Sequence, residues 1–313
     1  MDNKYPLVSI ITPSFNQGQY IEEAILSVKN QDYPNIEHII MDGGSTDGTV
    51  DILRKYDKDV NWDSEPDQGV ADALNKIFNR GLVKGEIVGL LPTSDSYPLN
   101  AVKNAAEFLQ KHPEIAAVYG DAMIIDEKNS SSYLMVSNEY NYERLLRSWG
   151  WKDRLRIPGV AIFIRKKIMD EVGLFADMVA NDYEYWLRIG AKHQFAYLPA
   201  ILANQRLHDN SISGDHEKVC KEQPKISRRY WGNPFTLRYI RLWWSFRSHL
   251  SLRCYQDARE KYYAKDLNTA RKKIILSLFN NPFTAFNREF LSLIIRSFVG
   301  DKTVNFLTFK KLK

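Results

Sequence analysis

The sequence predicts an α/β protein with a mostly parallel sheet flanked by helices, followed by a basic, mostly helical C-terminal extension. As far as residue 99, short apolar runs alternate with segments whose apolar residues recur at helical spacing, which is typical of repeated βα units. After the polar stretch 209–225 the composition changes, and aromatic and basic residues interleave. We therefore expect two domains, residues 1–226 and 227–313.

The expected elements follow these patterns in chain order. Strands are predicted at 7–12, 37–41, near 62–64, and at 86–91, 116–119, 161–164 and 200–207. Helices are predicted at 19–29, 49–56 and 70–80, from 99 to 112, from Asp182 onward, and as a pair between 257 and 280 that breaks near 266–268. Ser45 or Asp47 is the expected cap of the second helix.

Composition excludes several classes of protein. Of the 313 residues, 44% are hydrophobic and 26% are charged, as in ordinary globular proteins. No apolar run reaches the roughly 18 residues that cross a bilayer, and the first residues have no signal-peptide pattern. Cys220 and Cys254 lie too far apart for a metal or redox motif. We expect a cytoplasmic protein, located peripherally on the inner face of the plasma membrane.

Charge is distributed unevenly along the chain. From Arg228 to Lys313 there are 18 Lys and Arg against 5 Asp and Glu, a net charge of +13, whereas the preceding residues carry −8. Three interpretations remain open for the basic part: peripheral contact of residues 230–313 with an anionic membrane, packing of its aromatic residues onto the first domain, or nucleic-acid binding. The last is the least favoured, because no nucleic-acid-binding module is recognisable, and we expect no nucleic acid partner.

Polar residues follow the first two predicted strands. The run 7–12 leads into Pro13–Asn16, and the run 37–41 leads into Asp42 and a glycine-rich turn. The carboxyl ends of parallel strands hold ligands in open α/β sheets, so a nucleotide site is expected here. Alternatively, Asp42 only forms the turn by accepting backbone hydrogen bonds. The absence of Gly-x-Gly-x-x-Gly after the first strand, and of a P-loop, argues against a dinucleotide oxidoreductase and a nucleoside triphosphatase.

Six motifs in one order give the chain a family resemblance. They are Thr12–Asn16, Asp42–Thr49, Glu65–Gly69 with Asp72 and Asn75, Ser94–Asp95, Asn181–Trp186, and Arg206–His208 with Ser211 to Ser213. Over roughly residues 5–215 the chain resembles the family 2 glycosyltransferases, which have the GT-A fold, a Rossmann-like sheet. A single Gly-Gly-Ser turn is common, but six motifs in the same order are specific.

The resemblance implies an inverting hexosyltransferase-type enzyme. It would move a sugar from a nucleotide-sugar donor, UDP-linked, to a hydroxyl of a glycan or lipid-linked acceptor in cell-surface polysaccharide synthesis. Asp182 would be the catalytic base that takes the acceptor proton, although, without the resemblance, a helix N-cap is the favoured explanation of this aspartate. The residues implied in donor binding are Pro13, Ser14, Phe15, Asn16, Asp42, Gly43, Asp67, Gly69, Ser94 and Asp95.

The resemblance also implies a divalent metal, Mn²⁺ or Mg²⁺, at Asp95 and His208. The chain departs from the family pattern here, because Ser96 replaces the usual second aspartate, and a hydroxyl is a poorer ligand for these cations than a carboxylate. Weak metal binding, metal-independent transfer and lost activity all remain open. The alternative function is therefore a catalytically silent nucleotide-sugar-binding or assembly protein of the same fold. Lys76 and Arg80 either add charge near the donor phosphates or form a solvated helix face.

Overall fold

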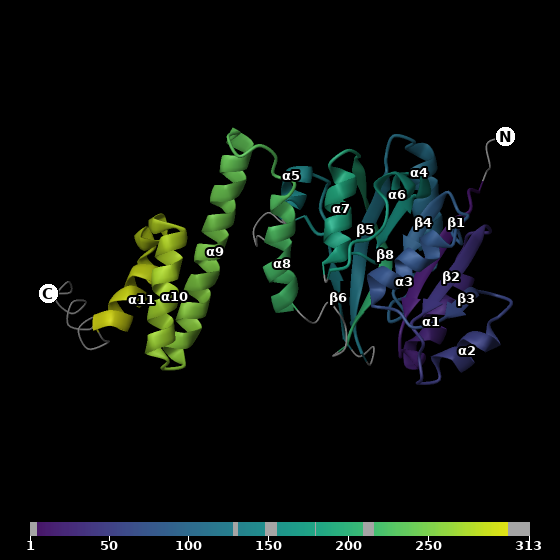
Figure 1. Ribbon diagram of the computed structural model, residues 1–313, viewed down its shortest axis with the longest axis horizontal. Coiled ribbons are helices and arrows are strands. Elements are labelled where there is room, and N and C mark those ends of the chain that lie inside the picture. The colour runs from purple at the N-terminus through teal and green to yellow at the C-terminus, as the bar shows by residue number, and fades with distance from the viewer. Residues whose placement is uncertain (1–4, 128–130, 148–154, 179, 209–215, 300–313) are drawn as a thin grey trace. The chain divides into compact units, whose positions relative to one another are not determined.

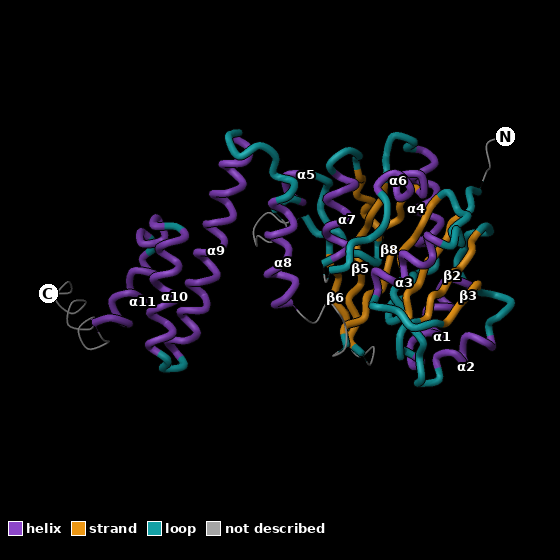
Figure 2. The backbone as a smooth tube through the Cα atoms, viewed as in Figure 1, coloured by secondary structure: helices purple, strands orange, loops and turns teal. Residues whose placement is uncertain are grey.

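The computed structural model describes residues 5–127, 131–147, 155–178, 180–208 and 216–299. The chain forms two compact units, Met1–Tyr230 and Trp231–Lys313. In the described residues, the first unit contains a sheet with helices around it, whereas the second contains helices alone (Figures 1 and 2).

The first unit is organised by an eight-stranded sheet with the order β3-β2-β1-β4-β7-β5-β6, in which β8 also pairs with β5. Strands β1 to β4 run parallel, β7 is antiparallel to both β4 and β5, β6 is antiparallel to β5, and β8 is parallel to β5. The strands are β1 (Val8–Ser14), β2 (Ile36–Asp42), β3 (Asn61–Ser64), β4 (Ile87–Leu90), β5 (Ala117–Asp126), β6 (Ser132–Met135), β7 (Ile162–Arg165) and β8 (Phe195–Leu207). The predicted mostly parallel sheet is confirmed.

Helices cover this sheet because their apolar residues recur on one side. In α1, for example, Ile21, Ala24 and Ile25 are buried, as expected for an amphipathic helix. The helices of this unit are α1 (Gly18–Lys29), α2 (Thr49–Lys55), α3 (Val70–Asn79), α4 (Ala101–Lys111), α5 (Tyr142–Leu145), α6 (Lys166–Val172), α7 (Asn181–Gly190) and α8 (His216–Arg228).

The predicted cap of α2 is wrong. The N-cap residue is Gly48, which has a left-handed φ of 92° and makes no side-chain cap. Asp47, one residue earlier, still accepts from the N–H of Thr49, the first residue of α2, at 3.1 Å. It also accepts from the Gly18 N–H at 2.8 Å, so it ties the start of α2 to the start of α1.

The second unit is a set of packed helices, which confirms the predicted helical character of the extension. It consists of α9 (Leu237–Tyr263), α10 (Leu267–Asn280), a 3₁₀ helix (Pro282–Phe286) and α11 (Arg288–Val299). Ala258, Ile274 and Phe290 are buried together in its core. The break between α9 and α10 lies just before the predicted position, since Asp266 caps α10 by accepting from the Thr269 N–H. In the described part of the chain, no helix is both long enough and apolar enough to span a bilayer.

Candidate active site

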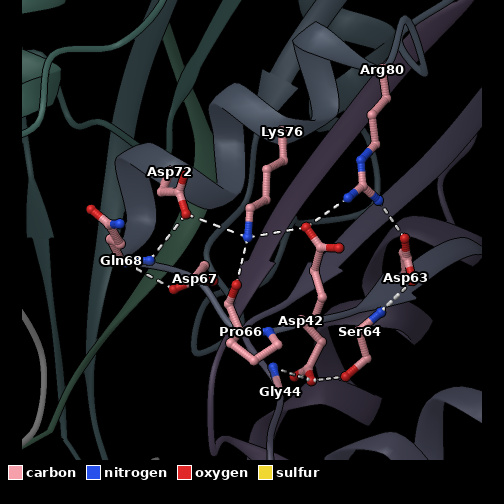
Figure 3. Close-up of polar contacts among 12 residues, drawn as sticks. Asp42, Gly44, Asp63, Ser64, Pro66, Asp67, Gln68, Asp72, Lys76 and Arg80 are labelled. Carbon is pink, nitrogen blue, oxygen red and sulfur yellow. Dashed lines mark hydrogen bonds and ion pairs between the residues drawn. The ribbon is translucent and has the colours of Figure 1, made fainter.

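Asp42 lies at the carboxyl end of β2, opposite Ser14 at the end of β1. The side chain is fully buried. Its Oδ2 accepts hydrogen bonds from Gly44 N at 3.1 Å, Ser45 N at 2.8 Å and Ser64 Oγ at 2.7 Å, as Figure 3 shows in part. These bonds make Asp42 the organising residue of the turn, as the turn-forming alternative expects, and its part in donor binding stays a prediction.

Gly43 lies where three elements of the site converge. A Cβ atom at this position would be 2.7 Å from Asp67 Oδ2 and 3.1 Å from Phe15 Cδ2. Only glycine therefore lets the Asp67 carboxylate and the Phe15 ring approach the end of β2 so closely. Phe15 keeps 56% of its surface exposed, and burial raises the pKa of Asp67 although the Gly69 N–H donates to its carboxylate.

Lys76 of α3 and Arg80, the residue that follows this helix, hold the loop that carries Asp67. Lys76 Nζ donates to the Pro66 carbonyl at 2.6 Å and lies 3.1 Å from Glu65 Oε1. Arg80 Nη2 pairs with the same Glu65 oxygen at 2.6 Å. Figure 3 shows both cations directed at this loop. Their charges are thus engaged by carboxylates, and they position Asp67 from the helix that follows it.

The tip of β1 contains a buried hydroxyl, that of Ser14. Ser14 is 4% exposed, and its Oγ makes no hydrogen bond to any of the residues that the structure describes. Next to it, Asn16 has a φ of 50° and accepts from the Thr46 N–H at 2.9 Å, while Thr93 Oγ1 donates to the Pro13 carbonyl at 2.8 Å. The β1 tip is therefore fixed to both neighbouring loops while one buried donor, the Ser14 hydroxyl, remains available.

Asp95 lies in the loop after β4 and is bound by β8. Its Oδ1 accepts from the Arg206 N–H at 2.8 Å. The Arg206 guanidinium donates to the Ser94 carbonyl at 3.1 Å and to Glu23 at 2.7 Å. Burial raises the pKa of Asp95 to about 7, against the opposing effect of Arg206. Arg206 thus holds the whole loop that the family resemblance assigns to the metal.

Ser96 faces a different hollow. Its backbone exchanges two hydrogen bonds with Asn204, and its Oγ accepts from Asn204 Nδ2 at 3.3 Å. It lines a groove of about 570 Å³ beside α1, which Asp42, Asp67 and Asp182 do not line. His208 packs its ring 5.3 Å from that of Tyr20. Among the described residues, no group of three or more His, Cys, Asp or Glu side chains could hold a metal ion.

Asp182 lies in the first turn of α7. The helix N-cap is Ala180, so the N-cap explanation for this aspartate is wrong. Asp182 Oδ1 accepts from the Tyr183 N–H at 2.6 Å, and Oδ2 would lie 3.1 Å from a Cβ on Gly159. Neighbouring protein atoms shield the Asp182 carboxylate from water and raise its pKa, although the residue as a whole remains exposed to solvent.

The register of β7 places Asp182 at the same sheet edge as Asp95. β7 is antiparallel to β4, with Phe163 opposite Gly89. The segment entering β7, which contains Gly159, therefore lies at the carboxyl end of β4, where the Asp95 loop also begins. The structure thus brings the three expected groups, the β1 and β2 tips, the Asp95 loop and Asp182, to one edge of the sheet.

Two positioning residues were not predicted from the sequence. Asn75 of α3 exchanges both amide hydrogen bonds with the Phe175 backbone, at 2.9 and 2.8 Å, which holds the segment before α7. Glu184 is buried and accepts from Tyr230 Oη at 2.7 Å and Arg188 Nη2 at 2.9 Å. Asn75 and Glu184 both lie inside the motifs on which the family resemblance depends, and only this position in the sequence could have indicated their importance.

The first unit is an open α/β sheet, and its candidate ligand-binding side chains lie at the edge where β1, β2 and β4 end. This is the arrangement of a GT-A glycosyltransferase. The chain belongs to Glycosyl transferase family 2, whose model matches residues 9–171, more than half of its length. The members to which it is similar are enzymes that transfer sugars.

Individual relatives support this assignment. A Bacillus subtilis protein named as a teichuronic acid biosynthesis glycosyltransferase, TuaG, is 29% identical over 71% of this chain and 87% of its own length. Other curated relatives are longer proteins, of which the chain spans as little as 21%.

Solved structures show the same fold at low sequence identity. Residues 1–349 of TarS from Staphylococcus aureus, in complex with UDP-GlcNAc, align with a TM-score of 0.58 and 16% identity over 88% of this chain and 92% of that one. The mannosyltransferase PcManGT from Pyrobaculum calidifontis, with GDP-Man and Mn²⁺, aligns with a TM-score of 0.50 and 18% identity over 94% and 85%.

Proposed function

We propose that this chain is an inverting glycosyltransferase that moves a sugar from a UDP-linked donor to a hydroxyl of a glycan or lipid-linked acceptor. The observation that carries the proposal is the convergence of the Gly43–Asp67–Phe15 contact, the Asp95 loop and Asp182 at one sheet edge. Cell-surface polysaccharide synthesis is the proposed setting, supported by the likeness to TuaG, and we propose that it takes place on the cytoplasmic side of the membrane.

The donor site uses the tips of β1 and β2. The exposed Phe15 ring presents apolar surface to a nucleotide, and the buried Ser14 hydroxyl presents a hydrogen-bond donor. Pro13 and Asn16 lie beside them in the same segment. Asp67 and Gly69 line the adjoining turn, and Asp42 acts by holding that turn in place. The backbone of Gly43 gives the nucleotide close access.

Asp182 is the proposed general base. The acceptor oxygen attacks the anomeric carbon from the side opposite the leaving group, so the C–O bond to the acceptor forms as the bond to the diphosphate breaks. The hydroxyl proton passes to the Asp182 carboxylate, and the nucleoside diphosphate departs with the electron pair of the broken bond. The raised pKa of Asp182 makes this carboxylate a stronger base near neutral pH.

The residues fit only a weakly held divalent cation. Asp95 supplies one carboxylate and already accepts the Arg206 N–H, and Ser96 supplies no charge. A cation that keeps most of its bonds to the donor diphosphate needs no more than one or two protein carboxylates; His208 is the second proposed ligand. When bound, the cation would neutralise charge on the leaving diphosphate. Because Asp95 must be ionised to bind it and its pKa is about 7, cation affinity should fall below that pH.

The Ser96–Asn204 contact favours one rival function, a silent nucleotide-sugar-binding protein. Titrating UDP-, GDP- and dTDP-sugars, each with EDTA, Mg²⁺ or Mn²⁺, tests both functions at once, and we expect a UDP-sugar to bind. Ser96→Asp then separates them. A modest gain in metal response from an already active wild type supports the transferase, whereas activity that arises only in the variant supports the silent protein. If no nucleotide sugar binds under any condition, both functions are wrong.

A further inference from the structure

We propose that the second unit binds the surface of an anionic phospholipid bilayer through one defined aromatic surface. This aromatic surface consists of Trp243, Trp244, Arg247, Leu276, Phe279 and Phe283. The proposal depends on the second unit alone and holds whatever sugar the first unit transfers.

Arg247 links the two helices that form the aromatic surface. Its guanidinium carbon lies 5.1 Å from the ring centroids of both Trp243 and Phe279. The same side chain donates to the Asn280 carbonyl at 2.9 Å and to the Phe279 carbonyl. A positive charge is thereby fixed between two aromatic rings, one from α9 and one from the end of α10.

The apolar members of this surface remain open to solvent. Phe279 is 71% exposed, Phe283 66%, Leu276 46% and Trp244 43%. Scattered apolar residues are normal on protein surfaces, but a contiguous group marks an interaction site. Leu276 and Phe279 are three residues apart on α10, and so are Trp244 and Arg247 on α9, so each pair lies on one helix face.

The charge of these elements selects an anionic partner. No acidic residue occurs between Leu237 and Gln256, in α10 or in the following 3₁₀ helix. Lys272 is exposed and lies four residues before Leu276, hence on the same face. Aromatic rings favour the bilayer interface, and basic residues near an anionic surface add to the attraction. A nucleic acid would use the charge but would leave Leu276 without a role.

Sedimentation of the full chain with phospholipid vesicles tests the proposal. Vesicles of phosphatidylcholine with about one third phosphatidylglycerol should bind the wild type, and phosphatidylcholine alone should bind it weakly. Leu276→Ser combined with Phe279→Ser should lower partitioning into the anionic vesicles about tenfold or more.

The chain offers a matched control pair. Leu252 and Tyr263 are 40% and 71% exposed, close to the values of the tested pair, and helical geometry puts them roughly 140–160° around α9 from Arg247. Leu252→Ser combined with Tyr263→Ser should bind vesicles like the wild type. Circular dichroism and donor binding of each variant exclude misfolding.

Several results would overturn the proposal. One is a wild type that does not bind anionic vesicles. Another is an equal loss of vesicle binding in the Leu276/Phe279 and the Leu252/Tyr263 variants. A third is unchanged vesicle binding in the Leu276/Phe279 variant, including the case in which light scattering shows that this variant has lost self-association, because the surface would then be a contact between proteins.

Discussion

Ser14 illustrates how a residue can be unfavourable for the fold and useful for a ligand. A buried hydroxyl without a hydrogen bond costs about 1–3 kcal/mol, and Ser14 Oγ is such a group at the tip of β1. A bound donor that accepts its hydrogen would remove this cost. Removing this hydroxyl should therefore leave the free energy of unfolding unchanged or raise it, while it weakens donor binding.

We predict that Ser14→Ala leaves the free energy of unfolding unchanged or raises it by about 1 kcal/mol, while it weakens donor binding. Ser9 on the same strand is the control, because its hydroxyl accepts a hydrogen bond from the Gly85 N–H at 2.8 Å and donates one to the Glu37 carboxylate. Ser9→Ala should lower stability and leave donor affinity unchanged. Urea unfolding and calorimetric titration measure both; donor binding unaffected by Ser14→Ala would remove this hydroxyl from the site.

Asp95 predicts a pH dependence of stability. Its pKa is about 7 in the folded protein against the ordinary aspartate value of 3.8, so between these values the folded state holds a proton that the unfolded chain has released. The free energy of unfolding contributed by Asp95 therefore falls as pH rises from about 4 to about 7 and stays low above that.

Asp95→Asn should consequently be stabilised relative to the wild type at pH 8, on the order of 4 kcal/mol, and not at pH 4. The amide oxygen can still accept the Arg206 N–H. Thermal melts of both proteins across this range provide the measurement. A difference that is constant with pH would show that Asp95 ionises normally in the folded protein.

Among elements, the connection between α3 and the segment before α7 has the clearest consequence. Asn75 holds Phe175 by two hydrogen bonds, and the Phe175 ring stacks on Tyr185 of α7 at 4.0 Å. We expect Asn75→Ala to cost about 2–3 kcal/mol of stability and to lower kcat by displacing Asp182. Asn79→Ala changes an exposed residue of the same helix and should do neither. Equal effects of the two substitutions would contradict this role of Asn75.

Elements also show how far the sequence alone could lead. Strands β1, β2 and β4 were predictable because strands buried on both faces are continuous apolar runs, and the regular stripes of α1 and α3 were equally clear. The extent of β5 and the existence of β6 were not, because Ser132–Met135 is largely exposed and gains its order from pairing with β5. The bonds of Asn75 and Arg206 span 100 or more residues, beyond the reach of local patterns.

At the scale of the whole molecule, the six motifs identified the residues of the candidate site but not what each side chain contacts. The sequence brought Asp42, Asp67, Asp95 and Asp182 together as candidates. The sequence could not show that the Asp42 carboxylate accepts hydrogen bonds from the turn, or that Ser96 lines a groove beside α1. Such facts depend on side-chain direction at a sheet edge, which the topology sets. The uneven charge of the chain was readable directly, and it underlies the proposed membrane contact.

In the proposed transfer, Asp182 removes the acceptor proton. The most direct test compares wild type, Asp182→Asn and Asp177→Asn, a nearby exposed aspartate, in turnover of the UDP-sugar that binds best. We predict that Asp182→Asn lowers turnover about 10²–10⁴-fold with unchanged donor affinity, and that Asp177→Asn behaves as wild type. Because the pKa of Asp182 is raised, the turnover of the wild type should fall on the acid side at a pH above 3.8, the ordinary pKa of an aspartate. Full turnover in Asp182→Asn, with the donor bound normally, would show that Asp182 does not take the acceptor proton.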